Sequence, residues 1–205
     1  MQLSILTPAV PSRIKQLDWL CDKISRLIRD SPVEHLVFLD NKKRSVGLKR
    51  DTLLRMARGK YVAFVDDDDD VSDDYVASIL GAADKDVDVI TFLQEASIDG
   101  QRGVVEFKLG NPNESFQGYE CGVNVGITKR NAWHVCAWRR TLAILSKFPD
   151  SNYGEDWQFA GPLCQIAKTE IHIPEILHYY RHNSKTTEAP PLNFASDEFR
   201  KVSGR

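Results

Sequence analysis

Three short apolar runs in the first 65 residues constrain the fold of this chain most strongly. They lie at residues 3–7, 36–39 and 61–65. Runs of this length predict buried strands, whereas apolar residues with helical spacing at 14–28, and a segment from a Ser45 cap to Ala57, predict two helices between them. Strands that alternate with helices predict βαβ units and a mainly parallel sheet with right-handed crossovers.

The rest of the chain is less regular. It predicts helices at 72–83, 138–148 and 156–167, and strands at 87–92, 104–109, 171–173 and 176–180. We find no internal repeat and no linker, so we expect one domain over residues 1–182. Residues 183–205 are polar, contain Pro190-Pro191 and end in basic residues, which predicts a mobile tail or a lid.

The composition agrees with one folded domain. The 205 residues are 42% hydrophobic and 27% charged, and the formal charge is −2, so no global field attracts nucleic acid or an anionic membrane. The first residues lack the basic start of a secretory signal, and no apolar run is long enough to span a membrane. We expect a cytoplasmic protein with reduced cysteines.

The least ordinary feature is a run of five aspartates, Asp66–Asp70, directly after an apolar run. Adjacent carboxylates repel one another, and a solvated surface run is the simplest alternative. However, ligands bind at the carboxyl ends of strands in open α/β sheets, and Mg²⁺ or Mn²⁺ prefers oxygen ligands. Val71 and Ala77 replace the glycine and glutamate of an EF-hand, and no Walker A or G-x-G-x-x-G motif is present. We therefore expect a divalent ion that acts on phosphate groups in a reaction other than those of ordinary NTPases and dinucleotide-dependent redox enzymes.

Six segments together resemble motifs of one enzyme family. The clearest are ARGKYVAFVDDDD at 57–69 and YGEDW at 153–157. The others are SILTP at 4–8, VFLD at 37–40, RD at 50–51 and YYRHNS at 179–184. In combination they resemble family 2 glycosyltransferases with the GT-A fold, continuously to about residue 76 and in patches beyond. The resemblance implies a single-domain, Rossmann-like α/β fold with a mixed, mainly parallel central sheet flanked by helices.

The resemblance implies roles for the aspartates. Asp66 would approach the ribose of a nucleotide diphosphate sugar, and Asp68 would hold Mn²⁺ or Mg²⁺. Asp69 would orient or share this ion. Asp67 would also bind the donor. Alternatively, Asp67 and Asp70 are only solvated neighbours of these residues.

Four further residues are implied near the donor. Thr7 and Pro8, in the first loop, would touch the nucleoside, Asp40 would bond the nucleobase, and Arg50 would approach the diphosphate. A turn at Asp40 and a solvated helix cation at Arg50 are the simpler alternatives.

Glu155 and Asp156 match the family's acidic pair. By resemblance Asp156 would be the general base that takes the proton of the acceptor hydroxyl, with inversion at the anomeric carbon, and Glu155 would orient the acceptor. Stabilisation of the helix that they begin is the alternative.

A late basic cluster of His178, Arg181 and His182 completes the expected site. Arg181 would bind the diphosphate, and either His178 or His182, the latter offset by one position from the motif, would be the last metal ligand.

Together these features predict a metal-dependent glycosyltransferase that moves a sugar, UDP-linked by preference, to an acceptor hydroxyl. We expect residues 1–95 to bind the nucleotide sugar and residues 96–182 to bind the acceptor. The acceptor stays open among saccharides, lipid-linked glycans, proteins and modified nucleic acids, because the segment 91–121 has no clear counterpart. The alternatives are a sugar nucleotidyltransferase, for which a Gly-rich phosphate loop is missing, and a non-catalytic nucleotide- or sugar-binding protein.

Overall fold

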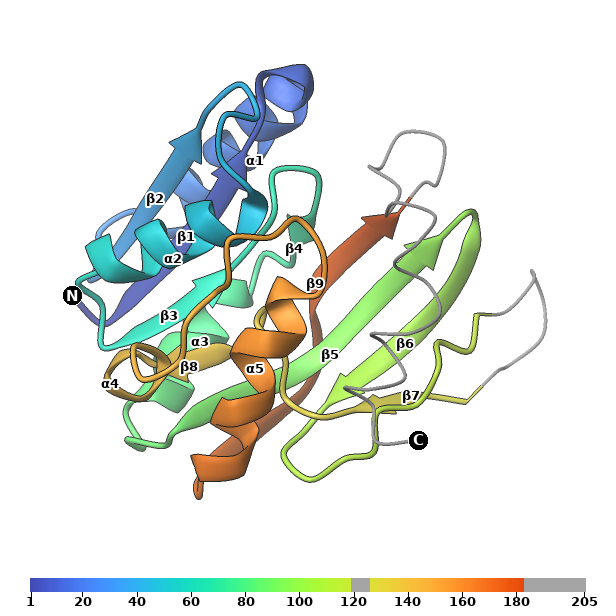
Figure 1. Ribbon diagram of the computed structural model, residues 1–205. Coiled ribbons are helices and arrows are strands. Elements are labelled where there is room, and N and C mark those ends of the chain that lie inside the picture. Colours follow the sequence, from blue (N-terminus) through green and yellow to red (C-terminus); the bar gives the residue numbers. More distant parts are fainter. Residues whose placement is uncertain (119–125, 183–205) are drawn as a thin grey trace.

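The computed structural model describes residues 1–118 and 126–182 (Figure 1). The strands are β1 (Leu3–Ala9), β2 (Val33–Leu39), β3 (Tyr61–Phe64), β4 (Asp70–Val71), β5 (Val89–Ile98), β6 (Gln101–Phe107), β7 (Thr128–Arg130), β8 (Ala137–Arg139) and β9 (Glu170–His182). The helices are α1 (Ile14–Leu27), α2 (Val46–Met56), α3 (Tyr75–Ala83), α4 (Arg140–Ala143) and α5 (Glu155–Ile166), with a 3₁₀ helix η1 (Pro11–Arg13) before α1. The expected tail or lid at 183–205 lies outside the described residues.

One mixed sheet forms the centre of the molecule, in the order β2-β1-β3-β8-β5-β6-β7, and β9 pairs with β5 and β4. β1 is parallel to both β2 and β3, and β8 is antiparallel to its neighbours β3 and β5. The expected α/β fold, with a mixed, mainly parallel sheet and flanking helices, is confirmed. Because β1, β2 and β3 run in the same direction, the loops that follow them meet at one edge of the sheet.

Helices bury both faces of this sheet (Figure 1). On one face Leu20 and Ile24 of α1 and Ile79 of α3 pack in a core with the apolar side chains of β1, β3 and β5. On the other face α2 and α5 pack through Leu54 and Phe159 onto β1, β3 and β8. Every residue of β1 is buried, as expected for a central parallel strand whose faces are both covered. No described helix has the length and apolarity that a membrane span requires.

Two sequence predictions about the second half are wrong. The expected helix at 138–148 is reduced to α4, because Ala137 and Trp138 belong to β8, where Trp138 pairs with Val62 and Val89. Backbone pairing in the sheet therefore overrides the helical spacing. The two short strands expected at 171–173 and 176–180 are one strand, β9, whose register against β5 shifts near Pro174. Proline lacks the N–H that a regular ladder needs.

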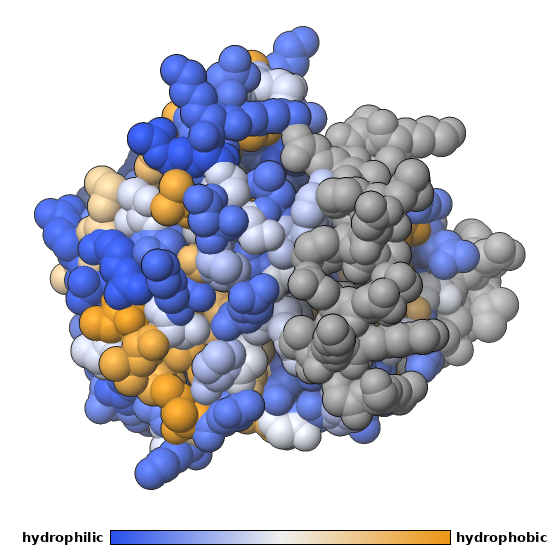
Figure 2. All heavy atoms as spheres, in the orientation of Figure 1, coloured by the Kyte–Doolittle hydropathy of each residue, from blue (hydrophilic) through white to orange (hydrophobic). Residues whose placement is uncertain are grey.

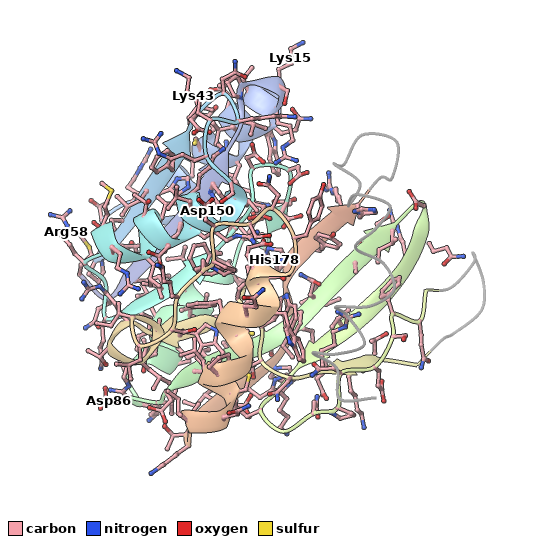
Figure 3. The ribbon with its side chains drawn as sticks, viewed as in Figure 1. Lys15, Lys43, Arg58, Asp86, Asp150 and His178 are labelled. Atoms are coloured by element: carbon pink, nitrogen blue, oxygen red, sulfur yellow. The ribbon has the colours of Figure 1, made fainter. Side chains whose placement is uncertain are left out.

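The start of α2 is bound to the segment that leads into α5. The Gly47 N–H donates to the Ser151 carbonyl at 3.0 Å, and the Ser45 hydroxyl lies 2.6 Å from Asp150, which Figure 3 places beside α2. A Cβ atom on Gly47 would lie 2.0 Å from the carbonyl oxygen of Pro149. Only glycine therefore allows this close approach of α2 to the segment 149–152.

Gly47→Ala is accordingly expected to destabilise the fold by about 1–3 kcal/mol, because the clash is with backbone atoms that cannot rotate away. Gly81→Ala is a matched control, since a Cβ on Gly81 in α3 meets nothing within 4 Å. That change is expected to stabilise the protein by roughly 0.5–1 kcal/mol. Urea unfolding of both variants measures the two effects, and equal stability of the two would contradict the close approach.

Candidate active site

The aspartate block begins where β3 ends. The Val65 N–H donates to the Leu6 carbonyl at 3.1 Å, so Asp66 is the first residue beyond the β1–β3 pairing. The Asp69 N–H donates to the Asp66 carbonyl at 3.1 Å and closes a turn, and Asp70 begins β4, which pairs with β9. The block is therefore a tight turn that leads from the carboxyl end of β3 into β4, which lies beside β9.

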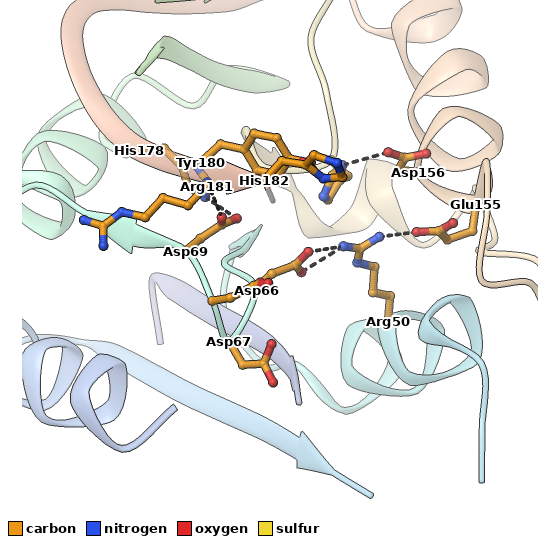
Figure 4. Close-up of polar contacts among 12 residues, drawn as sticks. Arg50, Asp66, Asp67, Asp69, Glu155, Asp156, His178, Tyr180, Arg181 and His182 are labelled. Atoms are coloured by element: carbon orange, nitrogen blue, oxygen red, sulfur yellow. Dashed lines mark hydrogen bonds and ion pairs between the residues drawn. The ribbon is translucent and has the colours of Figure 1, made fainter. Parts of the chain in front are cut away.

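Arg50 of α2 joins the aspartate block to α5. Its Nη2 donates to both carboxylate oxygens of Asp66, at 2.8 and 2.7 Å, and its Nη1 contacts Glu155 Oε1 (Figure 4). Burial would lower the pKa of Arg50, but Asp66 and Glu155 raise it above its ordinary value. Burial would raise the pKa of Asp66, but Arg50 outweighs this and lowers it, whereas burial raises the pKa of Glu155 to about 7. Arg50 is thus a buried cation between two carboxylates from distant parts of the chain, rather than a solvated helix residue.

Arg13 of η1 holds the next two aspartates. Asp67 is fully buried, accepts a hydrogen bond from the Val10 N–H at 2.9 Å, and lies 2.6 Å from Arg13 Nη2. Arg13 Nη1 donates to Asp68 at 2.8 Å. Burial raises the pKa of Asp67, and burial together with the neighbouring aspartates raises that of Asp68 to about 6. Neither Asp67 nor Asp70, whose side chain is 13% exposed, is the solvated neighbour considered from the sequence.

The pairing of β9 with β4 brings the late cluster to this turn. His178 is fully buried, with Nε2 3.5 Å from Asp69 Oδ2 and Nδ1 3.0 Å from Gln94 Nε2. The Arg181 N–H donates to Asp69 Oδ1 at 3.3 Å. Burial, with the charges of the preceding aspartates, raises the pKa of Asp69 well above its usual range, and burial lowers that of His178 to about 4.

The other members of the late cluster lie farther out. The Arg181 side chain is 67% exposed and points away from Asp66 and Asp69 (Figure 4), with Nη2 3.8 Å from Asp70 Oδ2 at the end of the block. His182 Nδ1 lies 3.5 Å from the Tyr180 hydroxyl. Of the two candidate histidines, His178 is therefore the one in contact with the aspartate block.

The donor groups at this turn suit a hard divalent ion. Carboxylate oxygens and an imidazole nitrogen are ligands of Mn²⁺, and crowded carboxylates with raised pKa values are relieved by a cation. His178 Nε2 is buried without a hydrogen-bond partner. Within the described part of the chain, however, no group of three or more His, Cys, Asp or Glu is arranged to hold a metal. Asp68, Asp69, His178 and His182 are thus chemically suitable, but they do not form a preassembled site.

Asp156 lies in the first turn of α5, after Gly154 in a left-handed conformation with φ 70°. Its side chain is 30% exposed, and Oδ1 accepts a hydrogen bond from the Trp157 N–H at 2.8 Å. Figure 4 shows Glu155 and Asp156 on α5 facing the aspartate block, with Arg50 between Glu155 and Asp66. The helix start therefore presents one carboxylate to Arg50 and a more exposed one beside it.

A cavity of about 320 Å³ lies next to these carboxylates, between the loop after β1 and the start of α2. Its wall combines Pro8, Asp66 and Glu155 with six basic residues, namely Arg13, Lys42, Lys43, Arg44, Lys49 and Arg50. Lys43 lies at the top of the molecule, a hydrophilic part of the surface (Figures 2 and 3). Such a wall favours an anionic ligand.

Two residues expected at the donor have protein partners in the structure. Thr7 lies within β1 rather than in a loop, and its fully buried hydroxyl is 2.9 Å from His35 Nε2. Asp40 Oδ1 is 2.7 Å from Lys49 Nζ, and its Oδ2 accepts from the Arg44 N–H at 3.1 Å. Pro8, which also lies in β1, lines the cavity.

Three residues of this region were missed by sequence reasoning. Arg13, Lys49 and His134 all lie at the site, and His134 Nδ1 is 4.0 Å from Asp156 Oδ2. Arg13 follows Pro11-Ser12 in the first loop, which was a usable signal. Lys49 adjoins Arg50 on a polar helix, and His134 lies in an irregular segment, so neither had a distinguishing pattern.

The sheet presents carboxylates and a basic cavity at the carboxyl ends of its parallel strands. Proteins of the open α/β class bind their ligands at this edge. The family model described as glycosyl transferase family 2 matches residues 23–144. The chain belongs to this family.

Solved structures show the same fold. S. aureus TarS 1-349 in complex with UDP-GlcNAc superposes with a TM-score of 0.65 at 16% identity, covering 98% of this chain and 64% of that one. Another TarS structure has a TM-score of 0.58 at 14% identity, covering 88% of this chain and 37% of that one. The mannosyltransferase PcManGT from Pyrobaculum calidifontis, in complex with GDP-Man and Mn²⁺, has a TM-score of 0.54 at 15% identity, covering 87% and 56%. This chain thus spans less than two thirds of the length of each, and no curated protein matched it.

Proposed function

We propose that the protein transfers a sugar from a nucleotide diphosphate sugar to an acceptor hydroxyl. The observation that carries the proposal is the bridge from Asp66 through Arg50 to Glu155, which sets the strand-end carboxylates opposite Asp156 beside a basic cavity. Family membership and neighbours that bind UDP-GlcNAc or GDP-Man support this chemistry.

In this proposal the donor occupies the basic cavity. The nucleoside lies against Pro8, Asp66 approaches the ribose, and the exposed Arg181 reaches the diphosphate. Thr7 and Asp67 shape the wall from within, because both are fully buried and have protein partners. Asp40 holds Lys49 at the base of the wall, or exchanges this partner for the nucleobase. UDP is our preferred nucleotide.

Asp156 is the proposed base. It takes the proton of the acceptor hydroxyl as the oxygen bonds to the anomeric carbon, and the bond from that carbon to the diphosphate breaks with inversion. Glu155, held by Arg50, orients the acceptor. When bound at Asp68 and Asp69, with His178 or His182 as a further ligand, Mn²⁺ or Mg²⁺ supplies Lewis-acid stabilisation of the departing diphosphate.

The two halves of the chain divide these tasks. Residues 1–95 supply most of the cavity wall and the aspartates, and residues 96–182 supply Glu155, Asp156 and the late cluster. The acceptor is a hydroxyl group on a saccharide, a lipid-linked glycan, a protein or a modified nucleic acid.

A donor panel tests the proposal. UDP-GlcNAc, UDP-glucose and GDP-mannose are incubated with the protein and Mn²⁺, and both the nucleoside diphosphate and the sugar product are measured. Release of a nucleoside diphosphate together with a transferred or hydrolysed sugar supports the proposal. Formation of a sugar 1-phosphate and a nucleoside triphosphate in a parallel incubation with added pyrophosphate would instead indicate a nucleotidyltransferase, and binding without turnover of any donor would indicate a non-catalytic protein.

UDP binding is expected to depend on a divalent ion. Calorimetric titration should show affinity with Mn²⁺ that falls at least about tenfold in EDTA, because the ion offsets the repulsion between the aspartates and the diphosphate. Asp68→Asn should reduce the metal-dependent affinity in the same way. Asp73→Asn is the matched control, since Asp73 is 91% exposed just beyond the block, and should leave affinity unchanged. Equal affinity of the wild type with and without metal would exclude this role.

A further inference from the structure

We propose that His134 is a positioning residue that donates its Nδ1–H to Asp156 and holds this carboxylate toward the acceptor. The inference rests on the proposed function, since it assigns a partner to the proposed base. Neither the sequence motifs nor the family resemblance pointed to His134.

The first observation is an unsatisfied polar atom. The His134 side chain is 10% exposed, and Nδ1 is buried with no hydrogen-bond partner. The group that it faces is Asp156 Oδ2, 4.0 Å away, the contact that is marked at Asp156 in Figure 4. Buried polar nitrogens are rarely left unpaired, and catalytic hydrogen bonds are often long before substrate binds. A shift of about 1 Å would make this contact a hydrogen bond.

The second observation is that the ring is held in place on several sides. Its centroid lies 6.3 Å from that of Phe64, the last residue of β3, and 6.3 Å from that of Trp133. Trp133 in turn contacts the ring of Trp157, next to Asp156, at 5.5 Å. The Trp133 carbonyl accepts a hydrogen bond from Trp138 Nε1 at 2.8 Å, which connects the segment 133–134 to β8. The segment 133–134 thus connects the end of β3 with the start of α5.

The surroundings also select the form of the imidazole. Burial, with Arg50 nearby, lowers the pKa of His134 well below its ordinary value, so the ring is neutral. A neutral ring carries one proton, and a lone pair on Nδ1 would face the carboxylate of Asp156 and be repelled by it. The proton therefore belongs on Nδ1.

The contact with His134 leaves the remaining lone pairs of the Asp156 carboxylate for the acceptor. Asp156 Oδ1 already accepts from the Trp157 N–H, and Oδ2 would accept from His134. With both oxygens held by hydrogen bonds, the 30% exposed carboxylate keeps a single orientation, and its remaining lone pairs point toward the acceptor. A general base requires this positioning.

Imidazole NMR tests the hydrogen bond without any substrate. The full chain is labelled with ¹⁵N-histidine, and the His134 signals are assigned as those absent from His134→Asn. We expect a neutral ring with the proton on Nδ1, and an Nδ1 resonance that shifts in Asp156→Ala while the other histidines stay unchanged. A proton on Nε2, or an Nδ1 signal that is indifferent to Asp156→Ala, would overturn the proposal.

Kinetics test the positioning role. Asparagine places its amide nitrogen where Nδ1 lies, whereas glutamine mimics Nε2, so His134→Asn should retain turnover within about threefold and His134→Gln should lose about 10²-fold in kcat at unchanged donor KM. Turnover is release of the nucleoside diphosphate from the best donor of the panel with Mn²⁺. His172→Gln is the matched control, because His172 is mostly buried against Glu106, in contacts separate from these residues. Thermal unfolding of each variant identifies any that lose the fold.

The failure of this inference differs from failure of the proposed function. If Asp156→Asn loses turnover but His134→Gln does not, Asp156 remains the base and the role of His134 is excluded. If Asp156→Asn retains turnover, the base assignment itself is wrong. With both roles correct, His134→Gln should have little further effect in the Asp156→Asn background, since residues that act as a unit are not additive.

Discussion

Asp156→Asn is expected to reduce sugar transfer by about 10²–10⁴-fold while the affinity for UDP and Mn²⁺ stays near that of the wild type. Asparagine keeps the size of the side chain and an oxygen that can accept from the Trp157 N–H, but it cannot take the acceptor proton. Because the Asp156 side chain is 30% exposed, the substitution should leave the fold intact. The Asp66–Arg50–Glu155 bridge is also left intact.

The matched measurement is Asp68→Asn, which should weaken both metal-dependent UDP binding and turnover. Two variants that merely destabilised the protein would lose both quantities together. Calorimetry and turnover are therefore measured on the same preparations. An Asp156→Asn protein with near-normal turnover would exclude Asp156 as the base and make Glu155, the other carboxylate at the start of α5, the candidate.

Arg50→Met is expected to destabilise the fold by about 3–5 kcal/mol, because it leaves buried carboxylates without their cation. Arg50 is 4% exposed and is the shared partner of Asp66 and Glu155, which lie in distant segments of the chain. Without it, the pKa of Asp66, which Arg50 lowers, should rise above that of the unfolded chain, and the pKa of Glu155, already raised by burial, should rise further. Such a group stabilises the fold below its unfolded pKa and loses this contribution as pH rises through its folded pKa. The loss of stability should therefore be greater at about pH 8 than at about pH 5.

Arg55→Met is the control on the same helix. The Arg55 side chain is 45% exposed and lies 3.3 Å from Asp51, so its removal should cost less than about 1 kcal/mol with little pH dependence. Urea unfolding at the two pH values measures both variants. Similar losses for Arg50→Met and Arg55→Met would mean that the Asp66–Arg50–Glu155 bridge does not stabilise the fold.

The bridge also explains why the site depends on tertiary contacts between α2 and the segment that leads into α5. Arg50 reaches Glu155 only because α2 begins against the segment 149–152, where Gly47 allows backbone contact. A change at Gly47 should therefore disturb the spacing between the strand-end aspartates and α5, and it would also crowd Glu155, whose Cβ would lie 3.1 Å from the added carbon.

The sequence by itself determined the first half of the fold. The apolar runs at 3–7, 36–39 and 61–65 and the Ser45 cap correspond to β1, β2, β3 and the start of α2, because local periodicity and burial agree there. The position of Asp66 at a strand end followed from the same pattern. The family was also accessible, because its motifs lie in continuous segments.

Only the tertiary structure decided how these segments meet. Local pattern could not show that Trp138 lies in a strand, that His178 rather than His182 contacts Asp69, or that Asp67 is buried against Arg13. Nor could it place His134 beside Asp156. Sheet pairing and helix packing across the domain bring the two residues of each contact together. Such long-range geometry leaves no periodic signal in the sequence around either residue.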